Sequence, residues 1–390
     1  MKLLQMRLFA EHMKTFLLSA SVLLLFILLG RALQLREMLM GLELSVFDTL
    51  KLFGYLSPFF LLIICPIACM LAVFLTFLRM STDRELVALK AGGVSLCQML
   101  PAPLFFSLLC TCFGFFISMH LQAWGMGNFR TEVLSIASSS ARIVVQPGVF
   151  NKDIPNMVMF ARKADPLNGT MADVMVEDRR SEKNRMTILA PEGAIDADYE
   201  SGEIVFLLRD GRSYTENDGA MTVMGFKEYA VRFSLDSLFK GVDLGPVKPK
   251  EYTWERLYDS KNQKKLAKGK SRLARKIEVE RHKRFVFPIA CMVLCIFVIP
   301  IATSFQGLKQ QTGVLLALLL FLSYYSFLML GISLGESGDL DPKIGLWVPN
   351  AVFLLLGLYG MRLADQERMP HFTELWASWK ARRKNKEASA

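Results

Sequence analysis

The histidines of this chain limit the catalytic chemistry that it can carry. A serine, histidine and aspartate set, or proton transfer by histidine, would have to use one of four histidines: His12, His120, His282 and His371. None of them lies between residues 123 and 251, the polar part of the chain where an active site outside a membrane would be expected. No His-Glu-x-x-His metal motif occurs either. We therefore expect no catalytic residue.

The cysteines follow the apolar parts of the sequence. All seven lie in or at the edge of apolar blocks, namely Cys65, Cys69, Cys97, Cys110, Cys112, Cys291 and Cys295. The polar insert has none, so it has neither a disulfide framework nor a cysteine zinc site. The pairs that stand one helical turn apart have no neighbouring carboxylate or histidine, and we interpret them as small packing residues. We expect no metal and no cofactor.

The chain also lacks a complete phosphate-binding loop. Gly269-Lys270-Ser271 has the ending of such a loop, but Lys264 stands where the first glycine is required. The surrounding sequence predicts a basic helix and not a strand, loop and helix. ATP hydrolysis by that route is therefore excluded.

Six apolar blocks must position any functional residues that remain. The chain has 390 residues, 52% of them hydrophobic, and a mean hydropathy of +0.32. About 20 residues of helix cross a bilayer, and six blocks qualify: residues 15–30, 53–78, 97–121, 285–303, 313–335 and 345–361. Their interiors contain no Asp, Glu, Lys or Arg, which argues against ion-coupled transport. The pattern predicts a polytopic α-helical membrane protein with six transmembrane helices and an inserted domain.

The insert between the third and fourth blocks has β character. Short β-prone runs at residues 143–145, 157–161, 174–177, 186–189, 204–208 and 229–234 are separated by turn signals. They predict an all-β domain of sandwich, jellyroll or open-barrel type. We therefore expect spans and a cytoplasmic helix of about residues 81–92 within residues 1–122, an all-β domain at 123–251, a basic helical connector at 252–284, spans at 285–363 and a basic tail at 364–390.

Basic residues in the short loops predict the orientation. Lys2, Arg7 and Lys14 flank the start of the first span, and Arg79, Arg84 and Lys90 lie in the second connection. With the basic tail, all three sets fall on one side if there are six spans, which predicts cytoplasmic termini and an outer insert. The first block resembles a signal peptide but lacks a cleavage site, so we expect it to be retained. The basic run Lys261–Lys276 disagrees with this rule.

The connection after the second span predicts a short amphipathic helix. Thr82 and Glu85 have capping-box spacing, Leu86 and Leu89 share a face, and Gly92-Gly93 ends the pattern. Glu85 is as well explained by capping as by contact with a partner protein.

Two further sets of residues have both a structural and a functional interpretation. Arg31 and Arg36 follow the first span, where they would be snorkelling anchors or would bind lipid phosphate groups. In the fifth span Tyr324 and Tyr325 precede Gly331-Ile-Ser-Leu-Gly335, a pattern that suits either simple helix packing or a seam that opens.

Several segments, in order along the chain, carry a family likeness. They are Pro66-Ile-Ala-Cys-Met-Leu-Ala with Asp83-Arg-Glu-Leu-Val-Ala-Leu-Lys-Ala-Gly-Gly-Val-Ser, then Glu280-Arg-His-Lys-Arg-Phe-Val-Phe-Pro288, then Leu334-Gly-Glu-Ser-Gly, and Trp347-Val-Pro-Asn350. Through them the chain resembles the lipopolysaccharide-export permeases LptF and LptG over nearly its whole length. The texture of the motifs favours the F-type.

The resemblance implies a non-catalytic permease subunit of an ABC-type exporter in the bacterial inner membrane, with residues 123–251 folded as a periplasmic jellyroll-like domain. Its partners would be a cytoplasmic ABC ATPase dimer, a second permease of the same family, periplasmic jellyroll bridge proteins and lipopolysaccharide, with no nucleic acid. It also implies that Asp83, Arg84, Glu85, Leu86 and Leu89 couple to the ATPase, that Arg31 and Arg36 meet lipid phosphates, and that the first and fifth spans form lateral gates that include Tyr324, Tyr325, Gly331 and Gly335.

Two other classes remain open on the sequence alone. A membrane-anchored envelope scaffold or sensor would use the β-domain to bind a periplasmic partner without moving a substrate. A polytopic envelope enzyme would need a polar cluster that the sequence conceals.

Overall fold

The described part of the chain forms two compact units. The computed structural model describes residues 2–38, 46–144, 146–151, 157–165, 168–179, 185–217, 220–234, 244–259, 272–304 and 310–366. A helical unit takes in residues 1–28, 57–124 and 252–390, and a β unit takes in residues 29–56 and 125–251. Each unit therefore combines segments that are far apart in the sequence.

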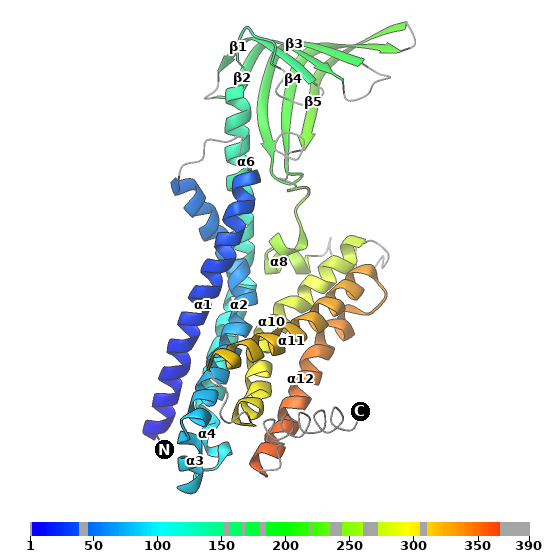
Figure 1. Ribbon diagram of the computed structural model, residues 1–390. Helices are drawn as coiled ribbons and strands as arrows, with labels where there is room; N and C mark the ends of the chain where they lie inside the picture. The colour runs from blue at the N-terminus through cyan, green and yellow to red at the C-terminus, as the bar shows by residue number, and fades with distance from the viewer. Residues whose placement is uncertain are drawn as a thin grey trace, which may run out of the picture. The chain divides into compact units, whose positions relative to one another are not determined.

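Long helices dominate the ends of the chain (Figure 1). In order they are α1 (Lys2–Met38), α2 (Val46–Thr82), α3 (Glu85–Ala91), α4 (Leu96–Met99), α5 (Pro101–Phe116), α6 (Gln122–Val144), α8 (Trp254–Tyr258), α10 (Arg272–Ser304), α11 (Gln310–Ser337) and α12 (Pro342–Asp365). A π-helical turn, η1 (Ile117–Leu121), joins α5 to α6 without a break, and a short 3₁₀ turn, η2 (Pro249–Glu251), precedes α8.

Six of the described helical segments are long and apolar enough to cross a membrane. They are residues 2–32, 46–82, 101–138, 272–304, 312–337 and 342–365. The predicted six-helix membrane protein with an inserted β-domain is therefore confirmed. The third segment begins at Pro101, because Ser95 caps the separate turn α4 and Pro101 starts a new helix.

The core of the helical unit lies around α2 and α10. Their apolar windows are 83% and 67% buried, against 6% for the first helix. α10 packs against α5, α11 and α12. Small side chains permit this packing: Cys65, Cys69, Cys291 and Cys295 are buried, as predicted for packing residues.

Glycine brings α11 and α12 into backbone contact. A Cβ atom added to Gly331 would overlap the carbonyl group of Gly345, and one added to Gly345 would lie 2.8 Å from the carbonyl oxygen of Gly331. Gly335 meets Pro342 of α12 and Val279 of α10. The small residues of the fifth span therefore serve packing within this chain, which was the simpler of the two interpretations.

The β unit is built on one antiparallel sheet of five strands in sequence order: β1 (Met157–Asp165), β2 (Thr170–Asp178), β3 (Arg185–Asp198), β4 (Glu203–Asn217) and β5 (Ala220–Ser234). Buried Met157, Met159 and Ala161 alternate with less buried neighbours along β1. The same core includes Leu52 of α2 and Val133 and Leu134 of α6. Residues of these two helices thus complete the core on one face of the sheet.

One predicted strand is wrong. Ile143 and Val144 are the last residues of α6 and do not belong to a strand. The helical period of α6 continues from buried Val133, Leu134 and Ala137 towards its end. Tertiary packing of that apolar stripe outweighs the β preference of the two branched residues.

We expect Gly331→Ala to destabilise the protein by about 1–3 kcal/mol, the usual cost of overpacking. The added Cβ meets backbone atoms of Gly345, and backbone cannot rotate away as a side chain can. Thermal unfolding in detergent or nanodiscs measures the change. Gly30→Ala is the control, because nothing lies within 4 Å of its Cβ position. Equal stability of the two variants would contradict the packing argument.

Candidate functional site

The short helix α3 carries the predicted coupling residues, but it is not capped as predicted. The Thr82 hydroxyl donates to the Leu78 carbonyl (2.9 Å) within α2, and α3 has no side-chain cap. The chain turns at Arg84, which has a left-handed φ of 57°. The capping box at Thr82 and Glu85 is therefore wrong, because α2 continues through Thr82 and engages its hydroxyl.

The remaining geometry of α3 agrees with an amphipathic helix. Leu86 is buried, Leu89 is half-buried, and Asp83 and Arg84 are exposed. The helix ends at Gly92-Gly93 as predicted, with Gly93 at φ 81°. The half-buried carboxylate of Glu85 therefore makes no capping bond, and its charge interacts with that of Arg79 at the end of α2.

The first helix places Arg31 at the end of an apolar run. α1 has 37 residues, so it is about 55 Å long and exceeds a hydrocarbon core of about 30 Å. Arg31 follows the run that ends at Gly30, and its side chain is exposed. Arg36 lies in α1 as well, and its side chain is outside the described residues.

The N-terminal half of α1 carries its contacts within the helical unit. The His12 ring is fully buried beside Phe77 and Phe106. The Thr76 hydroxyl donates its hydrogen to the Ala72 carbonyl (2.8 Å). Its oxygen can therefore only accept from His12, so the Nδ1–H of His12 is the donor in their hydrogen bond (3.2 Å). Further along α1 the exposed apolar side chains include Leu17, Leu18, Val22, Leu25 and Phe26.

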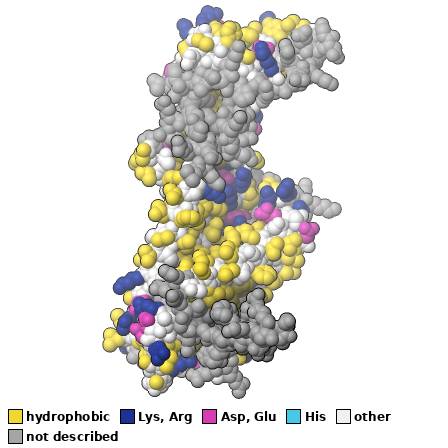
Figure 2. Space-filling model, in the orientation of Figure 1, with side chains coloured by type: hydrophobic (Ala, Val, Ile, Leu, Met, Phe, Trp, Pro, Cys, Tyr) yellow, Lys and Arg dark blue, Asp and Glu magenta, His cyan; other side chains and the backbone are white. Residues whose placement is uncertain are grey.

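The fifth candidate span, α11, has one face turned inward and one outward. Tyr324 is buried, and its hydroxyl donates to Asn350 Oδ1 of α12 (2.7 Å). Tyr325 is half-buried and stacks on Phe321 at 5.6 Å. The exposed side chains of the helix include Leu315, Leu319, Leu322, Phe327 and Leu330. Figure 2 shows hydrophobic side chains over the visible face of the helical unit.

The structure therefore divides the predicted gate residues. Tyr324, Gly331 and Gly335 face α12 and α10 of the same chain, whereas the outward face of α11 is aliphatic and aromatic. The segment Gly331-Ile-Ser-Leu-Gly335 also fits the Gly-x-Ser-x-Gly pattern of hydrolases. That pattern requires a strand-to-helix turn, and Ser333 lies inside α11.

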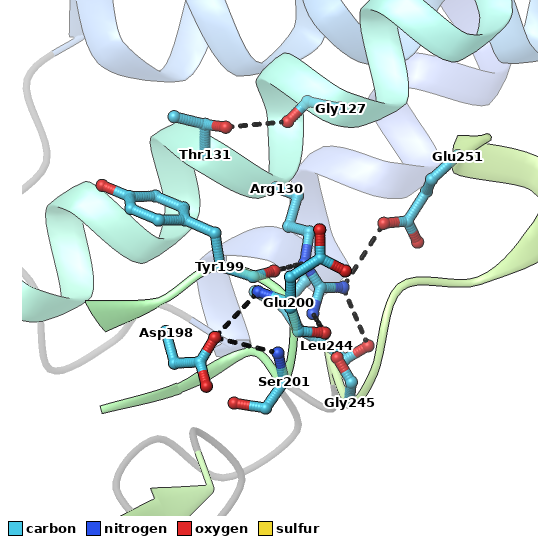
Figure 3. Close-up of polar contacts among 10 residues, drawn as sticks. All are labelled: Gly127, Arg130, Thr131, Asp198, Tyr199, Glu200, Ser201, Leu244, Gly245 and Glu251. Atoms are coloured by element: carbon cyan, nitrogen blue, oxygen red, sulfur yellow. Dashed lines mark hydrogen bonds and ion pairs between the residues drawn. The ribbon is translucent and has the colours of Figure 1, made fainter. Parts of the chain in front are cut away.

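A buried arginine organises the end of the β unit (Figure 3). The Arg130 guanidinium of α6 donates to the carbonyls of Tyr199 (2.8 Å) and Leu244 (3.4 Å), to that of Gly245, and to the Glu251 carboxylate (3.3 Å). The side chains of Arg130 and Glu251 are 6% and 7% exposed. Arg130 thus fastens the β3–β4 turn and the chain leaving the sheet to α6.

The β3–β4 turn has its own anionic anchor. Asp198 Oδ1 accepts from the backbone N–H groups of Glu200 (3.0 Å) and Ser201 (3.3 Å), and Arg232 lies 3.3 Å from Oδ2. Desolvation by itself would raise the pKa of Asp198. The hydrogen bonds from Ser201 and Glu200 and the charge of Arg232 outweigh it, so the pKa lies below its ordinary value.

A second buried arginine was missed by sequence reasoning. Arg284 is fully buried, and its Nε lies 3.8 Å from Glu280 one helical turn earlier. Gln122 donates to Glu280 (3.0 Å), and Ser118 donates to the Arg284 carbonyl (3.0 Å). The sequence pattern predicts both charged residues in a basic connector outside the spans. Their i, i+4 spacing next to an apolar block was the available signal.

Among the described residues, no group of three or more His, Cys, Asp and Glu side chains is arranged to hold a metal ion. The arrangement instead combines buried arginine clamps, exposed apolar helix faces and a polar surface helix.

Comparison with known proteins gives two findings. A family model described as lipopolysaccharide export system permease LptF/LptG matches residues 7–363. The chain is also similar to the uncharacterized protein RP871 of Rickettsia prowazekii (strain Madrid E). The two are 22% identical over 321 residues, which cover 81% of this chain and 86% of that protein.

We expect Arg130→Gln to destabilise the β unit by about 3–5 kcal/mol, since it leaves the Glu251 carboxylate buried without its cation. Limited proteolysis and thermal unfolding measure the loss. Arg162→Gln, at a side chain that is 70% exposed, is the control and should change little. Equal effects of the two substitutions would contradict the clamp.

The Asp198 turn should lose stability in acid. A carboxyl group whose pKa is lowered on folding stabilises the protein above its unfolded pKa of about 3.9, and this contribution disappears as the pH falls through the folded pKa. Acid unfolding of wild type and Asp198→Asn should therefore converge below about pH 4 and differ above it. Asp173→Asn, at an exposed carboxylate, is the control. A constant difference at all pH values would contradict the assignment.

Proposed function

The chain belongs to the lipopolysaccharide export system permease LptF/LptG family, and we propose that it is the membrane-spanning subunit of an ABC-type exporter that extracts lipopolysaccharide from the outer leaflet of the inner membrane. The family match over residues 7–363 carries the proposal. It includes all the segments on which the resemblance was based, so the predicted family is confirmed.

The chain itself supplies no catalytic step in this proposal. A separate cytoplasmic ATPase dimer hydrolyses ATP, and α3 is the element that contacts it. The buried Leu86 anchors α3 to its own chain, and the exposed residues Asp83 and Arg84 with the half-buried Glu85 form the contacting side. Removal of the capping explanation for Glu85 supports this role.

Substrate entry is assigned to the first and fifth spans. Within a bilayer, the exposed apolar faces of α1 and α11 must be covered by lipid tails or by another helix. A second permease of the same family covers them in part, and acyl chains pass between the two proteins. Arg31, at the end of the apolar run of α1, and Arg36 meet the lipid phosphates, for which guanidinium groups are well suited.

Tyr324, Gly331 and Gly335 face inward, so we assign them a structural role in the gate. They hold α11 closely on α12, so that the outward face of α11 moves with its neighbour as one gate. With six spans and basic short loops, both termini lie in the cytoplasm and the β unit is periplasmic. There the β unit passes lipopolysaccharide to jellyroll bridge proteins.

Reconstitution tests the proposal. The tagged chain is purified in mild detergent with whatever binds to it, placed in proteoliposomes with lipopolysaccharide, and supplied with ATP. Recovery of an ABC ATPase and a second permease, followed by ATP-dependent release of lipopolysaccharide, is the expected result. If the complex survives purification and contains no ATPase, or hydrolyses ATP without releasing lipid, an envelope scaffold is the better explanation.

Glu85→Ala should reduce lipopolysaccharide release by about 5–150-fold, the usual range for loss of coupling between linked sites. The reason is that ATPase movement no longer reaches the spans. Glu228→Ala is the control, because that carboxylate is 71% exposed on the β unit. Unchanged ATPase recovery and unchanged lipid release in Glu85→Ala would show that the coupling role is wrong.

A further inference from the structure

Two arginines of α10 hold the first residues that follow the β unit. Tyr252 comes directly after Glu251, the last residue of that unit. Arg284 Nη2 donates to the Tyr252 carbonyl, and Arg281 donates to the Leu257 carbonyl from Nε (3.1 Å) and Nη2. The Arg281 guanidinium also lies 4.3 Å from the centre of the Tyr258 ring. We call residues 252–258 the return segment.

The other side of this joint is the π-helical turn in the third candidate span. Ser118 belongs to η1, and its hydroxyl donates to the Arg284 carbonyl (3.0 Å). Gln122, the residue after η1, donates to Glu280 (3.0 Å). Single π-helical turns inside α-helices frequently lie at functional sites. Residues 118–122, α10 and the return segment therefore meet at Glu280 and Arg284.

Arg284 is incompletely satisfied although it is fully buried. Its Nε and Nη1 atoms have no hydrogen-bond partner among the described residues, and the 3.8 Å from Nε to Glu280 exceeds hydrogen-bond length. A buried ion pair is weak evidence for stability, because apolar residues of similar volume often do as well. A partly satisfied network is, in addition, easier to rearrange than a complete one.

We propose that Arg284 is a positioning residue that couples the π-helical turn of the third span and α10 to the return segment, so that movement of these helices changes the hold on the chain leaving the β unit. Its role in transport rests on the proposed function. The joint itself does not, since it is defined by contacts within the helical unit.

The same contacts explain part of the basic sequence before the fourth span. Arg275, Arg281 and Arg284 all donate to main-chain carbonyls, those of Glu336, Leu257 and Tyr252. Carbonyl groups at helix ends lack intrahelical partners and carry partial negative charge. These arginines therefore hold segments of the same chain together. Fewer arginines of this region then remain to bind lipid headgroups.

A double-mutant cycle tests the joint in the chain alone, in lipid nanodiscs. Ser118→Ala should raise the amide hydrogen exchange rate in residues 252–258 by about fivefold or more in the native background. The increase should be much smaller in an Arg284→Gln background, because the hydrogen bond from the Arg284 side chain to Tyr252 is already absent there. Lys343→Gln, at an exposed cation, should leave the Ser118→Ala effect intact. An equal effect of Ser118→Ala in both backgrounds would overturn the proposal.

Transport measurements separate coupling from folding. Glu280→Gln leaves the buried Arg284 without its counter-ion, and Arg284→Gln leaves Glu280 with only Lys283 (3.3 Å) as a cationic partner. Both should lower the unfolding temperature, and the double variant should recover part of it. We expect lipopolysaccharide released per ATP to remain about fivefold or more below wild type in the double variant. If the double variant recovered lipopolysaccharide release together with stability, the role of Arg284 would be purely structural. If the wild-type complex releases no lipopolysaccharide, the proposed function fails while the exchange cycle still decides the joint.

Discussion

Buried guanidinium groups that donate to main-chain carbonyls hold this protein together where regular structure ends. A carbonyl in a loop has no ladder or helix partner, and leaving it buried without a donor is costly. Arg130 serves the carbonyls of the β3–β4 turn and of the chain that leaves the sheet. Arg281 and Arg284 then serve the return segment. One planar fork with five donors can fasten several such groups, which lysine cannot do.

The helical unit shows a second division, between helices that are packed inside the chain and helices that are not. α2 and α10 are largely buried, and they meet at cysteine side chains: the Sγ atoms of Cys65 and Cys291 lie 3.8 Å apart. α1 and α11 keep long apolar side chains outward. In a bilayer such faces carry no hydrophobic penalty, so their exposure is compatible with a chain that exchanges neighbours. The tight Gly331–Gly345 contact fixes one side of α11 against α12, and the opposite side of α11 therefore faces outward.

Sequence reasoning succeeded where a single residue type or a block length decides the outcome. Block length and hydropathy predicted the six spans, and Gly92-Gly93 predicted the end of α3. It failed where tertiary context decides. Thr82 was assigned to a cap, yet α2 continues past the expected boundary and binds its hydroxyl. Ile143 and Val144 looked like a strand, yet α6 extends to Val144. Arg130 gave no signal because its carbonyl partners lie about 70 and 115 residues away.

The basic segment before the fourth span shows why charge alone is a poor guide to function. A run of lysine and arginine in front of a membrane helix is ordinarily assigned to lipid headgroups. Here the fully buried Arg284 cannot reach a headgroup without leaving its partners Tyr252 and Glu280. The positive charge is instead offset by Glu280 and by carbonyl dipoles inside the protein. Which arginines meet a lipid is therefore decided by exposure, and on that criterion Arg31 of α1 is the better candidate.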